Sequence, residues 1–166
     1  MKILHIDPKT KNSKLFNEYV EKGKDVFVIF YLEGCGPCNA TRPEWKKIEN
    51  ALKDKYGKNE NIVIADVDQE LLKEIKYLTT QPKGFPTIRY ITNKGKTSED
   101  YEDCPDIKDK DRKIDSFVKW IDSKMKKQQG GKRKRTTKQI KRRNKTTRNK
   151  TRKNKTRKNK TRKNKK

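Results

Sequence analysis

The residues of this sequence best suited to chemistry are two cysteines separated by two residues. Cys35 and Cys38 enclose Gly36 and Pro37, and the one further cysteine of the chain is Cys104. A thiol pair at this spacing can ligate a metal ion, stay inert inside a core, or exchange with the disulfide of another molecule. The surrounding residues have to decide among these three uses.

A zinc site is the first alternative, because three cysteines and the single histidine, His5, make up a Cys3His ligand set. A strong zinc prediction needs a second closely spaced ligand pair, and this chain has a single C-x-x-C. We therefore expect no metal. An inert buried pair is the second alternative, but Gly34 and Gly36 on either side of Cys35 favour an exposed thiol. Thiol–disulfide exchange is the interpretation that we favour.

Exchange chemistry gives each position of the motif a physical role. The apolar segment 25–32 predicts a strand, whose end delivers the motif to the edge where open α/β sheets place their sites. Cys35 then begins a helix, where free N–H groups and the helix dipole stabilise a thiolate. Cys38 lies one turn further and can attack a mixed disulfide formed at Cys35. Gly36 allows the turn, and Pro37 occupies a first-turn position that needs no N–H.

The elements that would position this motif follow the order β-α-β-α-β-α-β-β-α. Runs of β-branched and aromatic residues predict buried strands, and apolar residues three or four apart predict helices. The alternation predicts an α/β layered fold in which a final hairpin adds antiparallel strands. The expected strands are 3–6, 25–32, 61–68 and the hairpin 85–103, and the expected helices are 13–23, 41–57 with a bend at Pro43, 69–78 and 112–125.

Charge divides the chain into two parts. The whole sequence has a net charge of +25, but residues 130–166 hold 21 lysines and arginines and no acidic residue. The remaining 26 basic and 22 acidic residues give residues 1–129 a net charge of +4. We expect a globular domain over 1–127 and a tail over 128–166, with five-residue repeats, that is disordered when free.

The tail predicts binding to nucleic acid or another polyanion through residues 130–166, by release of counterions. Two basic clusters, 132–135 and 141–144, also fit the loose pattern of a nuclear localisation signal. The tail has no aromatic residue for base stacking, so we expect no sequence readout. A solvated tail without a dedicated ligand is the alternative. Such short-repeat basic tails resemble those on proteins of large DNA viruses.

The N-terminus reaches charged residues too early for a secretory signal peptide, and no run approaches the ~20 apolar residues of a membrane span. We therefore expect a cytoplasmic or nuclear protein without a membrane span, and a monomer. Structural disulfides are rare in those compartments, which again favours a catalytic use of the cysteine pair.

Two separated motifs make residues 1–127 resemble the thioredoxin superfamily. They are CGPC at 35–38, after an apolar strand, and GFPT at 84–87, before the hairpin. The resemblance implies a thioredoxin fold, a central mixed sheet flanked by helices. It also implies an enzyme that exchanges the disulfides of proteins and needs no cofactor besides its own Cys35–Cys38 disulfide.

The resemblance assigns roles to particular residues. Cys35 is expected to be the nucleophile, and Cys38 the thiol that resolves the mixed disulfide. Pro86 is expected to be cis and to lie against the cysteine pair. The backbone of Phe85 would then contact an extended substrate. The substrate-facing surface is completed by the loop residues Gly34, Gly36 and Pro37.

The motif CGPC looks like thioredoxin itself, whereas VIFY, RPEW and GFPTI look like the catalytic domains of protein disulfide isomerases. Those domains usually carry a histidine where Pro37 stands. The absence of this histidine favours a more reducing Cys35–Cys38 pair, with a reduction potential toward the thioredoxin value of about −270 mV.

Three positions depart from the family pattern. Gly34 replaces a tryptophan, Ile29 replaces a buried acid, and Ile64 replaces a buried lysine. An exchange of a buried ion pair for two apolar residues should not harm folding. It removes the group thought to take the proton from Cys38, for which water or Glu33 could substitute. We therefore expect slower resolution of mixed disulfides.

These departures leave a second hypothesis open, a non-catalytic polyanion-binding adaptor on a thioredoxin scaffold. Among the remaining candidates, we expect Cys104 to be a lone loop or packing thiol and His5 to be a half-buried strand residue. Trp45 and Trp120 have core-facing spacing. Arg112 precedes the last helix, where disulfide isomerases swing an arginine toward the site.

Overall fold

The computed structural model describes residues 1–127, of which residues 1–123 form one compact unit. The predicted basic tail over 128–166 lies outside the described residues. The fold and the site below are those of residues 1–123.

The strands form one five-stranded mixed sheet. They are β1 (Lys2–Ile6), β2 (Asp25–Tyr31), β3 (Ile62–Asp68), β4 (Thr87–Thr92) and β5 (Thr97–Asp100). Their order across the sheet is β1-β3-β2-β4-β5. β1 and β2 run parallel to β3, whereas β4 is antiparallel to β2 and β5 is antiparallel to β4. Every residue of β2 and β3 is buried, as expected for central strands covered on both faces.

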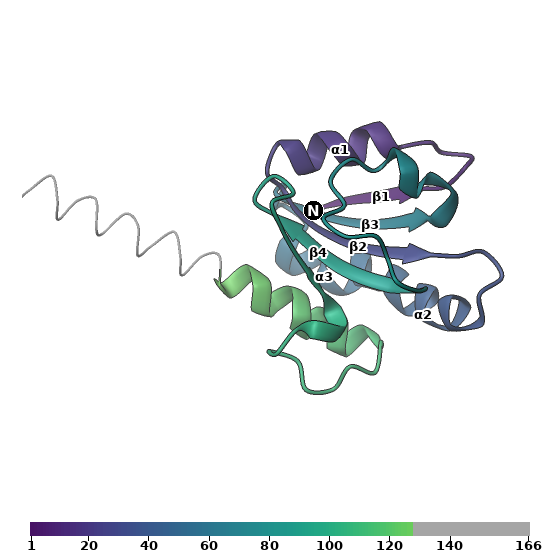
Figure 1. Ribbon diagram of the computed structural model, residues 1–166. Helices are drawn as coiled ribbons and strands as arrows, with labels where there is room; N and C mark the ends of the chain where they lie inside the picture. Colours follow the sequence, from purple (N-terminus) through teal and green to yellow (C-terminus); the bar gives the residue numbers. More distant parts are fainter. Residues whose placement is uncertain (128–166) are drawn as a thin grey trace, which may run out of the picture. The chain divides into compact units, whose positions relative to one another are not determined.

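Helices cover both faces of this sheet. Within the described residues they are α1 (Ser13–Glu21), α2 (Gly36–Lys46), α3 (Ile48–Tyr56) and a helix over 114–127, with 3₁₀ turns η1 (Gln69–Glu74) and η2 (Tyr101–Asp103). Figure 1 shows α1 on one face and α2 with α3 on the other. The predicted fold, a central mixed sheet flanked by helices, is confirmed.

The sheet face under α2 packs on a cluster of aromatic rings. Trp45 of α2 contacts Phe117, and Tyr101 contacts both Phe117 and Trp120, with ring centroids 5.3 to 5.4 Å apart. Phe27 of β2 contacts Trp120 from the sheet side at 5.2 Å. Trp45 and Trp120 are 3% and 0% exposed, so their predicted packing role is confirmed.

The predicted helix over 41–57 is two helices. α2 begins earlier, at Gly36, and the chain breaks at Lys47, four residues after Pro43. A proline inside a helix lacks the N–H that would bond the carbonyl four residues earlier, and its ring crowds that carbonyl. The missing bond affects the turn before Pro43, whereas the observed break lies one turn after it.

The predicted helix over 69–78 is wrong in length. A 3₁₀ turn ends at Glu74, and Ile75 is extended. Asn17 of α1 explains this end: its side chain donates to the carbonyl of Glu74 and accepts from the N–H of Lys76, both at 2.9 Å. These two bonds take backbone groups that a longer helix would have paired internally.

Candidate active site

The cysteine motif forms the junction between β2 and α2. β2 ends at Tyr31, and Cys35 is the N-cap residue of α2, with an extended backbone. The Cys35 sulfur accepts a hydrogen bond from the N–H of Cys38 at 3.4 Å. A partial negative charge on that sulfur is therefore stabilised by the start of the helix, as predicted.

Gly34 is required by the backbone of this junction rather than by crowding. Its φ is +77°, in the left-handed region, and a Cβ atom added there would have no neighbour within 4 Å. Gly36 has equally open surroundings. Gly34, Gly36 and Pro37 are all exposed, so Cys35 lies within an accessible stretch of chain.

The two sulfur atoms differ in environment although they lie 2.7 Å apart. Cys35 is partly exposed, whereas Cys38 is fully buried. Burial, and next the hydrogen bond to Cys35, raise the pKa of Cys38 to about 11, although a hydrogen bond with the Leu32 backbone and the charge of Arg42 act in the opposite direction. An incoming disulfide therefore meets Cys35 first, while Cys38 keeps its proton.

The segment before β4 closes the site from the other side. The peptide bond between Phe85 and Pro86 is cis. The Cys35 sulfur donates to the carbonyl of Phe85 at 3.7 Å, so this segment lies directly against the cysteine pair. Thr87 donates to the carbonyl of Gly84 at 2.7 Å and closes the turn around the proline. The structure thus brings together all the predicted site residues, which come from 34–38 and 85–86.

The two apolar replacements inside the sheet lie where the sequence places them. Ile29 and Ile64 are 0% and 3% exposed. Ile29 does not face Ile64, however: its register partner on β3 is Asp66, which is 6% exposed. Asp66 is thus a buried carboxylate beside Ile29 that the sequence analysis missed. The available signal was an acidic residue inside an otherwise apolar strand.

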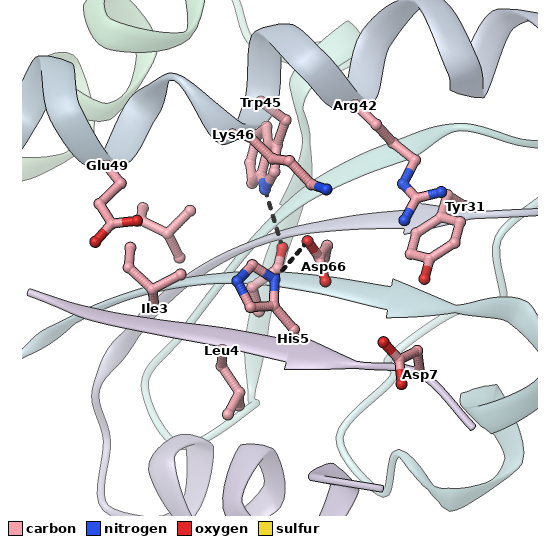
Figure 2. Close-up of a pocket in the computed structure, with 12 residues that line it drawn as sticks. Ile3, Leu4, His5, Asp7, Tyr31, Arg42, Trp45, Lys46, Glu49 and Asp66 are labelled. Atoms are coloured by element: carbon pink, nitrogen blue, oxygen red, sulfur yellow. Dashed lines mark hydrogen bonds and ion pairs between the residues drawn. The ribbon is translucent and has the colours of Figure 1, made fainter. Parts of the chain in front are cut away.

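Asp66 borders a pocket of about 270 Å³ between β1 and α2. Figure 2 shows His5 of β1 beside Asp66 of β3 at this pocket, and the His5 Nδ1 atom lies 2.8 Å from Asp66 Oδ2. The His5 side chain is 52% exposed, which agrees with the predicted half-buried strand residue. The polar lining comprises His5, Asp7, Tyr31, Arg42, Lys46, Glu49 and Asp66.

The other candidates lie outside the cysteine site. Cys104 is fully buried and its sulfur is 3.8 Å from Asp106 Oδ2, so it is a packing thiol. Arg112 donates from two nitrogens to Glu102, at 2.9 and 2.8 Å, and lines a pocket that also includes Pro37. Within residues 1–127, no three or more His, Cys, Asp or Glu side chains are grouped as metal ligands, and no helix is long and apolar enough to cross a membrane.

Comparison with known proteins decides the family. The family model described as Thioredoxin matches residues 7–120. The chain belongs to the thioredoxin family. Protein disulfide isomerase-like 2-1 of Oryza sativa subsp. japonica is 32% identical over 124 residues, which cover 74% of this chain and 29% of that protein. The protein disulfide-isomerase of Drosophila melanogaster is 35% identical over 106 residues, covering 63% of this chain and 18% of that protein.

Solved structures show the same fold. The zinc-bound form of human ERp44 superimposes with a TM-score of 0.55 at 19% identity, over 74% of this chain and 31% of that one. The J-Trx1 fragment of ERdj5 gives a TM-score of 0.52 at 19% identity, over 75% and 52%. The chain spans less than a third of the length of the curated relatives named above.

Proposed function

We propose that this thioredoxin-family chain is a thiol–disulfide oxidoreductase that acts on the disulfides of proteins. One observation carries the proposal: a partly exposed Cys35 caps a helix, 2.7 Å from a buried Cys38 and against the carbonyl of Phe85. A purely structural thiol pair needs neither the position of Cys35 at the start of a helix nor its partial exposure. The relatives named protein disulfide isomerase support the same reaction class.

The reaction takes place in two exchanges. The Cys35 thiolate attacks one sulfur of the substrate disulfide, and the other substrate sulfur leaves as a thiolate and takes a proton from water. The Cys38 thiolate then attacks the Cys35 sulfur, and the second substrate sulfur leaves in the same way. The substrate gains two electrons and two protons, and the enzyme is left with a Cys35–Cys38 disulfide. Reversal of these steps would oxidise a dithiol substrate.

The substrate would lie across the exposed loop and the segment before β4. Gly34, Gly36 and Pro37 are exposed beside the reactive sulfur. The partly buried Phe85 and the buried Pro86 form the opposite wall. An extended peptide next to Cys35 would contact mainly backbone here, which suits an enzyme for many sequences. The dithiol itself is the redox group, so the proposal includes no further cofactor, and a monomer suffices.

The basic tail adds a second part to the proposal, polyanion binding or nuclear targeting. It rests on the 21 basic and no acidic residues of 130–166. A carrier without catalysis is the competing function, and it is favoured by the buried, apolar Ile29 at the position where the family usually has an acid. The cytoplasmic or nuclear location stays a prediction.

Reduction of insulin in the presence of dithiothreitol tests the enzyme. The wild-type chain and the control Cys104→Ala should both accelerate the reaction, whereas Cys35→Ser should fall to the rate of dithiothreitol alone. A chain without 130–166 should keep the reductase activity and lose retention on immobilised nucleic acid. Absence of turnover in both the full and the shortened chain would support the carrier instead.

A further inference from the structure

Arg42 lies on the same side of α2 as the resolving thiol. It follows Cys38 by four residues, and side chains four apart in a helix are neighbours. Its guanidinium carbon is 3.7 Å from the centre of the Tyr31 ring (Figure 2). Tyr31 is the buried last residue of β2, and burial raises the pKa of its phenol to about 12, so the ring stays neutral. The stack fixes the guanidinium beside the motif.

The charge of Arg42 is only weakly neutralised. Its Nη1 atom lies 3.4 Å from Glu33 Oε2, but the Glu33 side chain is 77% exposed, so water screens this pair. The Arg42 Nε atom is buried and has no hydrogen-bond partner among the described residues. A fixed, partly desolvated cation acts strongly on nearby groups that can become anions.

Cys38 is such a group. It is fully buried, and its attack on a mixed disulfide requires it to lose a proton in that environment. Ile29 and Ile64 carry no ionisable group, the buried Asp66 beside Ile29 is paired with His5, and the Glu33 side chain is 77% exposed. Burial is the main effect on the pKa of Cys38 and raises it, whereas a hydrogen bond with the Leu32 backbone and, to a smaller extent, the positive charge of Arg42 lower it.

We propose that Arg42 is a positioning residue for the resolving step, where its guanidinium, held on Tyr31, favours the thiolate of Cys38. The inference rests on the proposed oxidoreductase function. In this step the Cys38 proton passes to water, a bond forms between the Cys38 and Cys35 sulfurs, and the bond from Cys35 to the substrate sulfur breaks. The substrate leaves as a thiolate that water protonates, and two electrons pass to the substrate.

The step can be observed by mixing the reduced full-length chain with dithiobis(nitrobenzoate) in a stopped-flow spectrophotometer. Attack by Cys35 releases the first coloured thiolate at a rate that rises with reagent concentration. Attack by Cys38 on the resulting mixed disulfide releases the second coloured thiolate, at a rate that is independent of reagent concentration. The two phases separate the nucleophile from the resolving thiol in one trace.

Arg42→Gln should slow the second phase and leave the first nearly unchanged. If the loss of the positive charge raises the pKa of Cys38 by about one unit, the thiolate fraction of Cys38 falls about tenfold at neutral pH. A more basic thiolate is a better nucleophile by roughly threefold per unit, so the net slowing is about threefold. The pH at which the second phase reaches half of its maximal rate should rise by about one unit. Arg42→Lys should retain most of the wild-type rate.

Charged neighbours supply the controls. The groups that face Arg42 across the loop and the pocket are Tyr31, Glu33, His5, Asp7, Asp66 and Lys46. Lys46→Gln removes an equal charge from α2 one turn beyond Arg42 and should leave both phases unchanged. Glu33→Gln removes the anion paired with Arg42 and should leave the second phase as fast as wild type or faster.

Two results would overturn the role of Arg42. One is an Arg42→Gln variant with a wild-type second phase and pH profile. The other is a Glu33→Gln variant slowed as much as Arg42→Gln, since that would assign the effect to Glu33, as a proton acceptor or as a brace on the loop, rather than to the charge of Arg42. A wild-type chain that releases only the first thiolate would instead refute the proposed oxidoreductase, because Cys38 would then not resolve at all.

Discussion

At the scale of single residues, the site depends on unequal burial of two sulfurs in one helical turn. Cys35 caps α2 and is partly exposed, and Cys38 is enclosed by the sheet and the helix. The enclosed thiol is stable as long as it carries its proton. Oxidation to the disulfide removes the proton, and no charge can then form at the buried sulfur. The stability of the two redox forms therefore depends differently on pH.

We expect the reduced form to lose stability relative to the oxidised form between pH 9 and 11. The pKa of Cys38 is raised from 9.0 to about 11 in the folded chain, so the folded state holds this proton more tightly. The stabilisation is complete below pH 9 and is lost as the pH rises through 11, by up to about 3 kcal/mol.

Urea unfolding of both redox forms across this pH range measures the difference. Tyr31, whose pKa is also raised, titrates alike in both forms and cancels. The reduced Cys38→Ala variant should follow the oxidised wild-type protein. If the free energy of unfolding varied with pH in the same way for the reduced and the oxidised wild-type protein, the assigned environment of Cys38 would be contradicted.

At the scale of elements, β4 is fastened to the segment before it by a buried arginine. Arg89 is 2% exposed and donates to both carboxylate oxygens of Asp100 on β5 and to the carbonyl of Thr80. The segment from Thr80 to Pro86 carries the wall of the site opposite Cys35. Arg89 therefore links the hairpin to the segment whose Phe85 carbonyl lies against Cys35.

Arg89→Lys should destabilise the chain by about 2 kcal/mol, because lysine keeps the charge but cannot make the forked bonds. The KM for insulin should rise more than kcat falls, since the wall of the site loosens while the sulfurs stay in place. Urea unfolding and steady-state kinetics measure the two effects. Lys96→Met, at an exposed position of the same hairpin, should change stability by less than about 0.5 kcal/mol. If Arg89→Lys kept the wild-type KM for insulin, the link between Arg89 and the segment that carries Phe85 and Pro86 would be refuted.

Local patterns predicted most of the elements and the cysteine pair, because strand burial, helix spacing and C-x-x-C are properties of neighbouring residues. The failures involve distant residues. The helix predicted over 69–78 ends early because Asn17 of α1 binds its backbone. Asp66 and Arg42 became relevant only through the register of β2 with β3 and through the stack on Tyr31. Neither contact follows from the local periodicities and motifs on which the predictions were based.

At the scale of the whole molecule, the chain joins a nearly neutral domain to a strongly cationic tail. The net charge of +4 over 1–129 contrasts with 21 basic residues over 130–166. Any affinity for a polyanion should therefore come from the tail and depend on salt, not on base sequence.

Binding of fluorescent single-stranded oligonucleotides should weaken steeply with salt, with a log–log slope of about −0.7 for each phosphate neutralised. Oligonucleotides of equal length and different sequence should bind alike. Fluorescence anisotropy at several salt concentrations measures both, and the chain without 130–166 is the control. Undiminished binding by that shortened chain would assign the affinity to the domain.

The open surroundings of Gly34 and Gly36 affect which disulfides can reach the enzyme. A Cβ atom added at either glycine would meet no heavy atom within 4 Å beyond its neighbours along the chain, so no side chain crowds these two flanks of Cys35. Along the loop, these flanks would not hinder a bulky, folded partner. Discrimination among partners should then follow how easily each disulfide is reduced, and shape should matter little.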